Sequence, residues 1–311
     1  MSKVVKSYKG FNKDMTCRGF QYKEGKEYKT SKAVVCNEGF HACEHPLVCL
    51  DYYPPNTSIY HEVEQTGEFS SVFCGRDSKI ASTKIKIGAK LSIAGLVQAA
   101  IDFTKSKTVT MQDATGDHGV SSATGDSGVS SATGICGASS ATGDYGASSA
   151  TGYCGASSAT GDYGASSATG YKGASSATGY CGASSATGDY GVSSATGDSG
   201  VSSATGSGGV SSATGYKGAS SATGDHGVSS STGHKGASSA DNSTAVAVAW
   251  GYKSKAKGCI GAHIVCAEWK YDKFKSDWFF VGAKMSIVDG VKIKADTYYT
   301  LRDGEFVEVE E

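Results

Sequence analysis

The stretch ATGDYGASSATGYCGASSATG, residues 141–161, contains two copies of a nine-residue phrase and the start of a third. Aligned on ATG, the phrase recurs every ninth residue from Ala114 to Ser231, which makes fourteen units over residues 114–239. The consensus is A-T-G-x-x-G-[AV]-S-S, and the last unit begins S-T-G. A fixed period of this kind indicates a repeat architecture before any propensity is considered.

Each unit divides into a turn and a short extended segment. The G-x-x-G part bends the chain because Gly tolerates positive φ, and the five small residues that remain can lie extended. A helix with two Gly in every nine residues would lose about 1 kcal/mol for each. Disorder is the other alternative for small polar repeats, but the spacing never slips. The sequence therefore predicts a mainly β protein with a parallel β-solenoid, or β-roll, of 14 nonapeptide units.

The variable pairs within the turns give a hint of the coil length. Over four successive units they alternate, which favours an 18-residue coil with two distinct sides: Asp144-Tyr145, Tyr153-Cys154, Asp162-Tyr163 and Tyr171-Lys172. Seven such coils would stack at about 4.8 Å. Val occurs only at the seventh position of the unit, so we expect the face with Thr, Val and the ninth-position Ser to point inward. Buried hydroxyls would then need hydrogen bonds between coils.

The sequence divides into three regions. We expect a small N-terminal α+β domain with a capping helix, the solenoid, and a C-terminal β-rich cap, at residues 1–110, 111–258 and 259–311. In the first, KIASTKIKIG (79–88) alternates like a half-buried strand, and 92–103 predicts a helix with Ser92 as N-cap. In the last, strands are expected in AHIVCAEW, WFFVGAKMSIV, VKIKADTYYTL and EFVEVE. Asp289-Gly290 and Asp303-Gly304 are typical of hairpin turns.

Composition excludes several classes of function. The formal net charge of −1 gives no general attraction to nucleic acid or anionic membranes. The start of the chain has no apolar signal-peptide core, and no stretch approaches the roughly 18 apolar residues of a membrane helix. We therefore expect cytoplasmic synthesis, no membrane insertion, and ten cysteines that stay reduced.

The turn pairs supply the candidate binding residues. Tyrosines stacked at coil spacing would form aromatic columns on the outside, suited to a glycan or protein partner. The alternative is that they only stack on one another and stabilise the rod. The candidates are Tyr145, Tyr153, Tyr163, Tyr171, Tyr180, Tyr190 and Tyr216.

Two sets of residues are candidate metal ligands. Cys36, His41, Cys43, His45 and Cys49 are residue types that suit zinc, but their spacing contains no C-x2-C pair. Buried thiols in a core strand and turn are the favoured interpretation. Turn aspartates occur in seven of fourteen units, too few oxygen ligands for calcium, at Asp117, Asp126, Asp144, Asp162, Asp189, Asp198 and Asp225. We expect no cofactor and no catalytic site.

STAVAVAWGYKSKAKG (residues 243–258) and the ATGxxG phrases resemble the head repeats of trimeric autotransporter adhesins. The resemblance covers roughly residues 114–258 and implies a parallel β-roll, a homo-oligomer and specifically a trimer. The nine-residue period departs from that family, and so does the expected lack of a membrane anchor. The overall layout is also similar to uncharacterised repeat proteins of gut bacteria and their phages, which implies a virion-associated or fibre-like part.

Three functions follow as hypotheses. The favoured one is a non-catalytic structural and adhesive protein with a rigid solenoid shaft. An ice-binding solenoid is the second, and it requires the repeated threonines, from Thr115 to Thr232, to face outward. An effector or enzyme domain at the N-terminus, carried on a solenoid spacer, is the third.

Overall fold

The computed structural model describes residues 3–55, 57–71, 78–107 and 111–309 of the 311-residue chain. The chain forms two compact units, Met1–Phe103 and Thr104–Glu311. The sequence analysis placed the boundary between the N-terminal domain and the solenoid after residue 110. Residues 108–110 lie outside the described residues. No helix in the described chain is long and apolar enough to cross a membrane.

The first unit is a small β-rich domain. Its main strands are β1 (Val5–Asn12), β4 (Glu27–Lys29), β5 (Phe40–Cys43), β6 (Ser58–Ser71) and β7 (Lys79–Leu91). They pair antiparallel in the order β4-β7-β5-β1-β6, and β7 also pairs with β6. Strands β1, β6, β7 and β5 therefore form a closed ring of pairings, which leaves fewer open edges.

Smaller elements complete this unit. They are the hairpin β2 (Thr16–Cys17) and β3 (Phe20–Gln21), then η1 (Pro46–Val48), α1 (Cys49–Tyr52) and α2 (Ile93–Lys107), which continues into the second unit. The strand expected at 79–88 is confirmed as part of β7. The helix expected at 92–103 is confirmed as α2, and the Ser92 hydroxyl accepts the Gly95 N–H at 3.1 Å as its N-cap.

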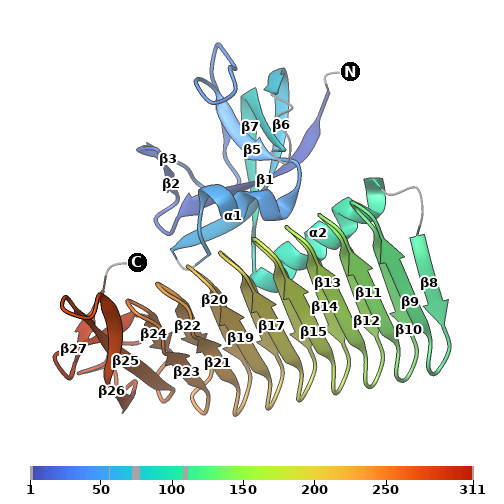
Figure 1. Ribbon diagram of the computed structural model, residues 1–311. Helices are drawn as coiled ribbons and strands as arrows, with labels where there is room; N and C mark the ends of the chain where they lie inside the picture. Colours follow the sequence, from blue (N-terminus) through green and yellow to red (C-terminus); the bar gives the residue numbers. More distant parts are fainter. Residues whose placement is uncertain (1–2, 56, 72–77, 108–110, 310–311) are drawn as a thin grey trace. The chain divides into compact units, whose positions relative to one another are not determined.

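The second unit is a parallel β-solenoid, as the sequence predicted (Figure 1). One sheet stacks nine parallel strands: β8 (Met111–Thr115), β10 (Val129–Thr133), β12 (Ala147–Thr151), β14 (Ala165–Thr169), β16 (Ala183–Thr187), β18 (Val201–Thr205), β20 (Ala219–Thr223), β22 (Ala237–Ala240) and β24 (Lys255–Gly258). The other stacks β9 (Val120–Thr124), β11 (Ala138–Thr142), β13 (Ala156–Thr160), β15 (Ala174–Thr178), β17 (Val192–Thr196), β19 (Val210–Thr214), β21 (Val228–Ser231), β23 (Val246–Ala249) and β25 (His263–Asp272).

The coil contains 18 residues, as the alternating turn pairs predicted. Val129 pairs with Ala147 and Ala138 with Ala156, and this offset holds from coil to coil until β23 and β25, where Val246 pairs with His263, 17 residues on. Each turn is also paired, because Gly143 N–H donates to the Thr160 carbonyl of the next coil at 2.8 Å. Backbone hydrogen bonds between coils thus replace the large apolar core that the composition lacks.

The expected interior face is wrong. The first-position Ala and the eighth-position Ser point inward, while Thr points outward: in β12, Ser148 and Ala150 are fully buried and Thr151 is exposed. Ala and Ser are smaller than Val and Thr, so the two sheets can approach closely. Val at the seventh position lies on the outer face, and its preference for that position reflects outer packing and strand propensity.

The inward serines form one continuous ladder between the two sheets. Each hydroxyl donates to, or accepts from, the serine nine residues away, at 2.8 to 3.0 Å. The chain of hydroxyls runs from Ser121 to Ser238. Because every second member lies on the opposite sheet, the ladder joins the sheets and satisfies the buried hydroxyls.

The C-terminal residues follow the last coils. β26 (Asp277–Ile287) pairs antiparallel with β25, and β27 (Tyr299–Arg302) pairs with both β24 and β28 (Glu305–Glu308). The Asp303-Gly304 hairpin is confirmed between β27 and β28. The hairpin expected at Asp289-Gly290 is wrong: the Asp289 carboxylate accepts three backbone N–H groups of residues 291–293 and closes a longer loop instead.

Candidate functional sites

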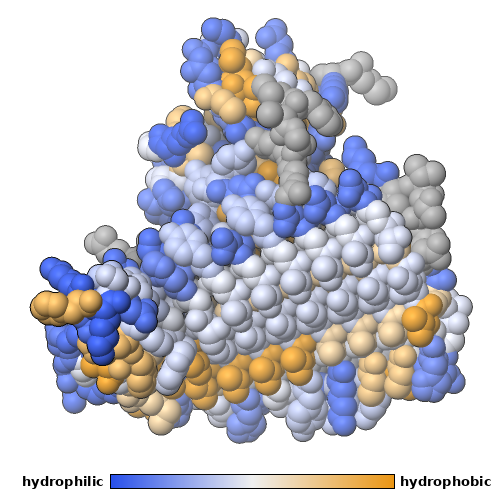
Figure 2. All heavy atoms as spheres, viewed as in Figure 1, coloured by the Kyte–Doolittle hydropathy of each residue, from blue (hydrophilic) through white to orange (hydrophobic). Residues whose placement is uncertain are grey.

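The outer face of the β9–β25 sheet is flat and uncharged from β9 to β21. Each strand contributes the seventh, ninth and second positions of its unit, which are Ala or Val, Ser and Thr. All of them are at least partly exposed across these seven strands. Figure 2 shows this face as a regular array of near-neutral side chains, bordered by an apolar band.

A shallow depression of about 440 Å³ follows the same face. Its lining consists of Ala, Val and Ser side chains of β9, β11, β13, β15 and β17. No charged side chain belongs to this lining among the described residues. The parallel strands repeat at about 4.8 Å, so the face is a lattice of methyl and hydroxyl groups with one fixed spacing.

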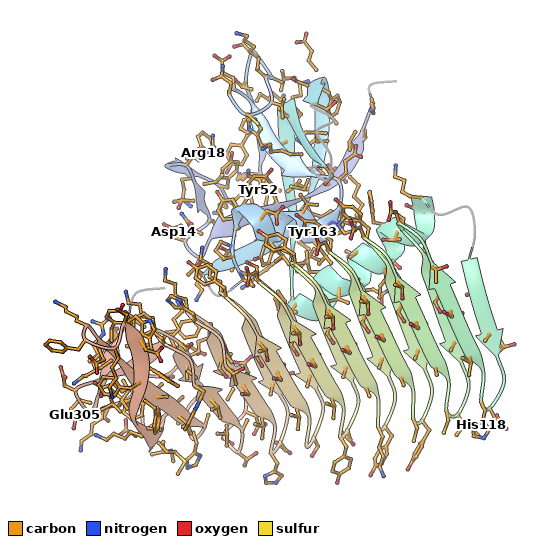
Figure 3. The ribbon with its side chains drawn as sticks, in the orientation of Figure 1. Asp14, Arg18, Tyr52, His118, Tyr163 and Glu305 are labelled. Atoms are coloured by element: carbon orange, nitrogen blue, oxygen red, sulfur yellow. The ribbon has the colours of Figure 1, made fainter. Side chains whose placement is uncertain are left out.

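The candidate tyrosines lie in two columns on opposite edges of the solenoid. Those after β12, β14 and β16 are Tyr153, Tyr171 and Tyr190; those after β11, β13, β15 and β19 are Tyr145, Tyr163, Tyr180 and Tyr216. Figure 3 labels one residue of each column: His118 lies on the edge of the first column, and Tyr163 lies on the opposite edge, in the second column. The sequence predicted two distinct sides of the coil, but it did not assign the seven tyrosines to them.

The tyrosine rings stack within each column. Both interpretations of the tyrosines, as a binding surface and as a stabiliser of the rod, require this stacking. The Tyr145 and Tyr163 rings stack at 5.2 Å with an interplanar angle of 7°. Tyr153 and Tyr171 stack at 5.0 Å and 17°. The second column continues past the repeat, where Tyr252 lies 3.7 Å from the Trp278 ring. The sequence did not predict that the column extends to these two rings, because they lie in the non-repetitive sequence after the repeat.

The tyrosines differ in exposure. Tyr153 and Tyr190 are each 54 % exposed, whereas Tyr163 is 4 % exposed. Tyr163 therefore does not present the external ring that the sequence predicted. Tyr171, Tyr180 and Tyr216 are exposed and Tyr145 is half-buried.

The turn aspartates have a structural role. Asp162 Oδ1 accepts the Tyr180 N–H of the next coil at 3.0 Å, and Asp189 accepts the Ser207 N–H at 3.0 Å. Asp144 and Asp198 make the same bond over longer distances. An acidic side chain at this turn position therefore ties one coil to the next.

The cysteine and histidine set of the first unit does not gather around one point. His41 and Cys43 lie in β5, His45 is the N-cap of η1, and Cys49 begins α1. Cys36 is exposed in a turn with φ of 65°. Within the described residues, no group of three His, Cys, Asp or Glu side chains is placed to hold a metal ion.

His45 is buried for packing. Its Nδ1 accepts the Leu47 N–H at 3.3 Å, and its ring contacts Phe103 edge-on. Burial lowers the pKa of His45 to about 3, so the ring stays neutral at ordinary pH. His45, Cys43 and Cys49 therefore agree with the interpretation of these residues as core, whereas the exposed Cys36 does not.

A pocket of about 560 Å³ lies within the first unit. β1, the β2–β3 hairpin, β5, α1 and the start of β7 supply its walls. Four of the five cysteine and histidine candidates line it, namely Cys36, His41, Cys43 and Cys49. Sequence reasoning missed this pocket because its residues are spread over residues 8–79 and carry no motif.

The comparisons with known proteins reach only this first unit. Residues 5–99 match a family described as a domain of unknown function, DUF7666. The match covers less than half of the chain, includes the whole pocket, and excludes the repeat. Searches of curated proteins and of solved structures return no match.

Proposed function

We propose that the chain is a non-catalytic structural and adhesive protein that binds a neutral glycan along its solenoid. The observation that carries this proposal is the exposed, uncharged face from β9 to β21, with one hydroxyl-bearing row per coil. Ser and Thr hydroxyls both donate and accept hydrogen bonds. Small side chains lose little conformational entropy when a ligand covers them.

The regular spacing favours an extended ligand. Each coil repeats the same three side chains, so a polymer that crosses several coils would gain many weak contacts at once. The exposed rings of Tyr153 and Tyr190 at the neighbouring turns add flat apolar surfaces with a polar tip. The described residues of this face carry no charge, which favours a neutral polymer over an acidic one.

The test compares one substitution on each sheet. Thr160 in β13 and Thr169 in β14 occupy the same position of their units and are both exposed. Retention of the full chain by dextran, galactomannan and mixed-linkage β-glucan would be measured by affinity electrophoresis. We expect Thr160→Lys to reduce retention at least about tenfold and the control Thr169→Lys to retain it.

A deletion checks the same proposal without adding charge. Removing residues 156–191 takes out four units, or two coils, and joins Gly155 to Val192 in the correct phase. Binding should weaken because fewer rows remain. Unchanged binding by this deletion, or equal loss in Thr160→Lys and Thr169→Lys, would rule out the proposed face.

Self-association is the second part of the proposal. β26 is the edge strand of its sheet, and it exposes Phe279, Val281, Met285 and Ile287. Exposed apolar edge strands are sites of pairing with another chain. A homo-oligomer, with a trimer as the adhesin resemblance implies, would provide several solenoids for a fibre-like assembly of a bacterium or phage.

Ice binding is the second candidate, and one observation favours it. The repeated threonines face outward on both sheets, as that hypothesis required. Thr142, Thr160 and Thr178 form part of a column of methyl and hydroxyl groups on the flat face. Thermal hysteresis that is lost in Thr160→Lys would support this function, and its absence in the unmodified protein would eliminate it.

A further inference from the structure

The pocket of the first unit opens where two strands of the sheet separate. β1 and β5 are neighbours in the sheet, but among the described residues they pair at one position, where Tyr8 lies opposite Cys43. Beyond it, the Lys9 side chain reaches across, and its Nζ donates to the His41 carbonyl at 2.7 Å. Gly10 is required here, since a Cβ would lie 2.5 Å from Tyr53.

Positive charge gathers in this pocket. Lys9, Arg18 and Lys79 line it, and none of the described lining residues is Asp or Glu. Lys9 is only 5 % exposed, and its ammonium lies over the Phe11 and Tyr22 rings at 5.5 Å. Burial of a lysine is costly unless an anion or several acceptors compensate it.

His41 adds an unsatisfied group. Within the described residues, its Nε2 atom is buried and has no hydrogen-bond partner. Burial lowers the pKa of His41, and Lys9, Lys79 and Arg18 lower it further. The three cations therefore act together at this ring, which lines the same pocket.

Aromatic rings form the other part of the wall. Phe20, Tyr22, Tyr52 and Tyr53 all contribute to the lining. Tyr53 donates its hydroxyl to Cys17 Sγ at 2.8 Å, which holds the ring in place. Figure 3 shows Arg18 at the β2–β3 hairpin and Tyr52 at the end of α1, so cationic and aromatic groups come from different elements.

We propose that this pocket binds a nucleoside phosphate, with the phosphate at Arg18, His41 and Lys79 and the base against the tyrosine rings. Arginine and lysine bind phosphate through charge-assisted hydrogen bonds. Bases stack on aromatic side chains. A volume of about 560 Å³ lies within the usual range for small-molecule sites. The proposed glycan binding by the solenoid does not depend on this pocket.

The experiment titrates the full chain with AMP, adenosine and inorganic phosphate by calorimetry. We expect AMP to bind more tightly than either part alone, because both halves of the pocket then contribute. Arg18→Gln should weaken AMP binding roughly tenfold or more. Arg18 is exposed, so this variant should fold. Lys84→Gln, an exposed cation of β7 outside the pocket, is the matched control.

A second variant separates the two halves of the ligand. Tyr52→Ala should weaken AMP binding much more than phosphate binding, because it removes a ring of the aromatic wall. A small loss of phosphate binding is expected as well, since Lys79 Nζ donates to the Tyr52 hydroxyl at 3.1 Å. In NMR titrations, AMP should raise the pKa of His41, since a bound anion favours the imidazolium. No AMP binding at millimolar concentration, or equal loss in Arg18→Gln and Lys84→Gln, would overturn the proposal. Equal affinities for AMP and phosphate would show that the pocket binds only an anion, and would contradict the proposed binding of the nucleoside.

Discussion

Gly152 shows how a single residue enforces the repeat. It is the third residue of its unit, has φ of 154°, and a Cβ there would lie 1.5 Å from the Gly134 carbonyl oxygen of the preceding coil. The same contact recurs at the third-position glycines of later coils. The unvarying Gly of ATG is therefore required by coil stacking as well as by backbone conformation.

A matched pair of substitutions separates these two requirements. Gly116 has φ of 126°, but a Cβ there meets nothing within 4 Å. We expect Gly116→Ala to cost about 1 kcal/mol of unfolding free energy, from backbone strain alone. Gly152→Ala should cost several times more, because the coils must separate. Urea unfolding of both variants measures the difference, and equal costs would contradict the stacking explanation.

At the scale of elements, the serine ladder explains how two sheets of small residues hold together. The sheets contribute alternate hydroxyls, so each hydrogen bond joins a strand of one sheet to a strand of the other. Alanine methyl groups fill the space between them. An interior of this composition buries little apolar surface per coil, and satisfied hydroxyls therefore matter more than in an ordinary core.

Ser157 in β13 tests the ladder. Its hydroxyl donates to Ser148 and accepts from Ser166. We expect Ser157→Ala to lower the unfolding free energy by about 1–3 kcal/mol, since Ser166 loses its acceptor in a buried position. Ser158→Ala, at the half-buried outer position of the same strand, should change it by less than about 0.5 kcal/mol. Similar effects at the two positions, measured by urea unfolding, would argue against the ladder.

At the scale of the whole molecule, the exposed edge of β26 bears on assembly. Met285 is 63 % exposed on that strand, beside other apolar side chains. We predict that the unmodified protein has the mass of more than one chain by size-exclusion chromatography with light scattering. Met285→Lys should reduce that mass, because lysine on an edge strand opposes pairing.

The control for this prediction is Val192→Lys. Val192 is 47 % exposed on β17, an interior strand of the same sheet, and receives the same apolar-to-cationic change. It should leave the mass unaltered. A monomeric unmodified protein would contradict self-association through β26 and would weaken the trimer that the adhesin resemblance implies.

Local sequence information determined much of this protein. The period, the G-x-x-G turns and the alternating turn pairs were enough to predict a parallel solenoid with an 18-residue coil, because each unit repeats the same local conformation. The strand at 79–88 and the helix capped by Ser92 were also predictable, since periodicity and capping are local. The candidate tyrosines were identified, but not their division into two columns or the burial of Tyr163.

Only the tertiary structure decided which strand face points inward. Val at the seventh position indicated the wrong face, because the close approach of the sheets selects the smaller Ala and Ser over Val and Thr. Likewise, Asp289 closes a loop rather than a hairpin because no strand follows it directly. The pocket joins Lys9, Arg18, His41 and Lys79 through long-range strand pairing, which no local sequence pattern records.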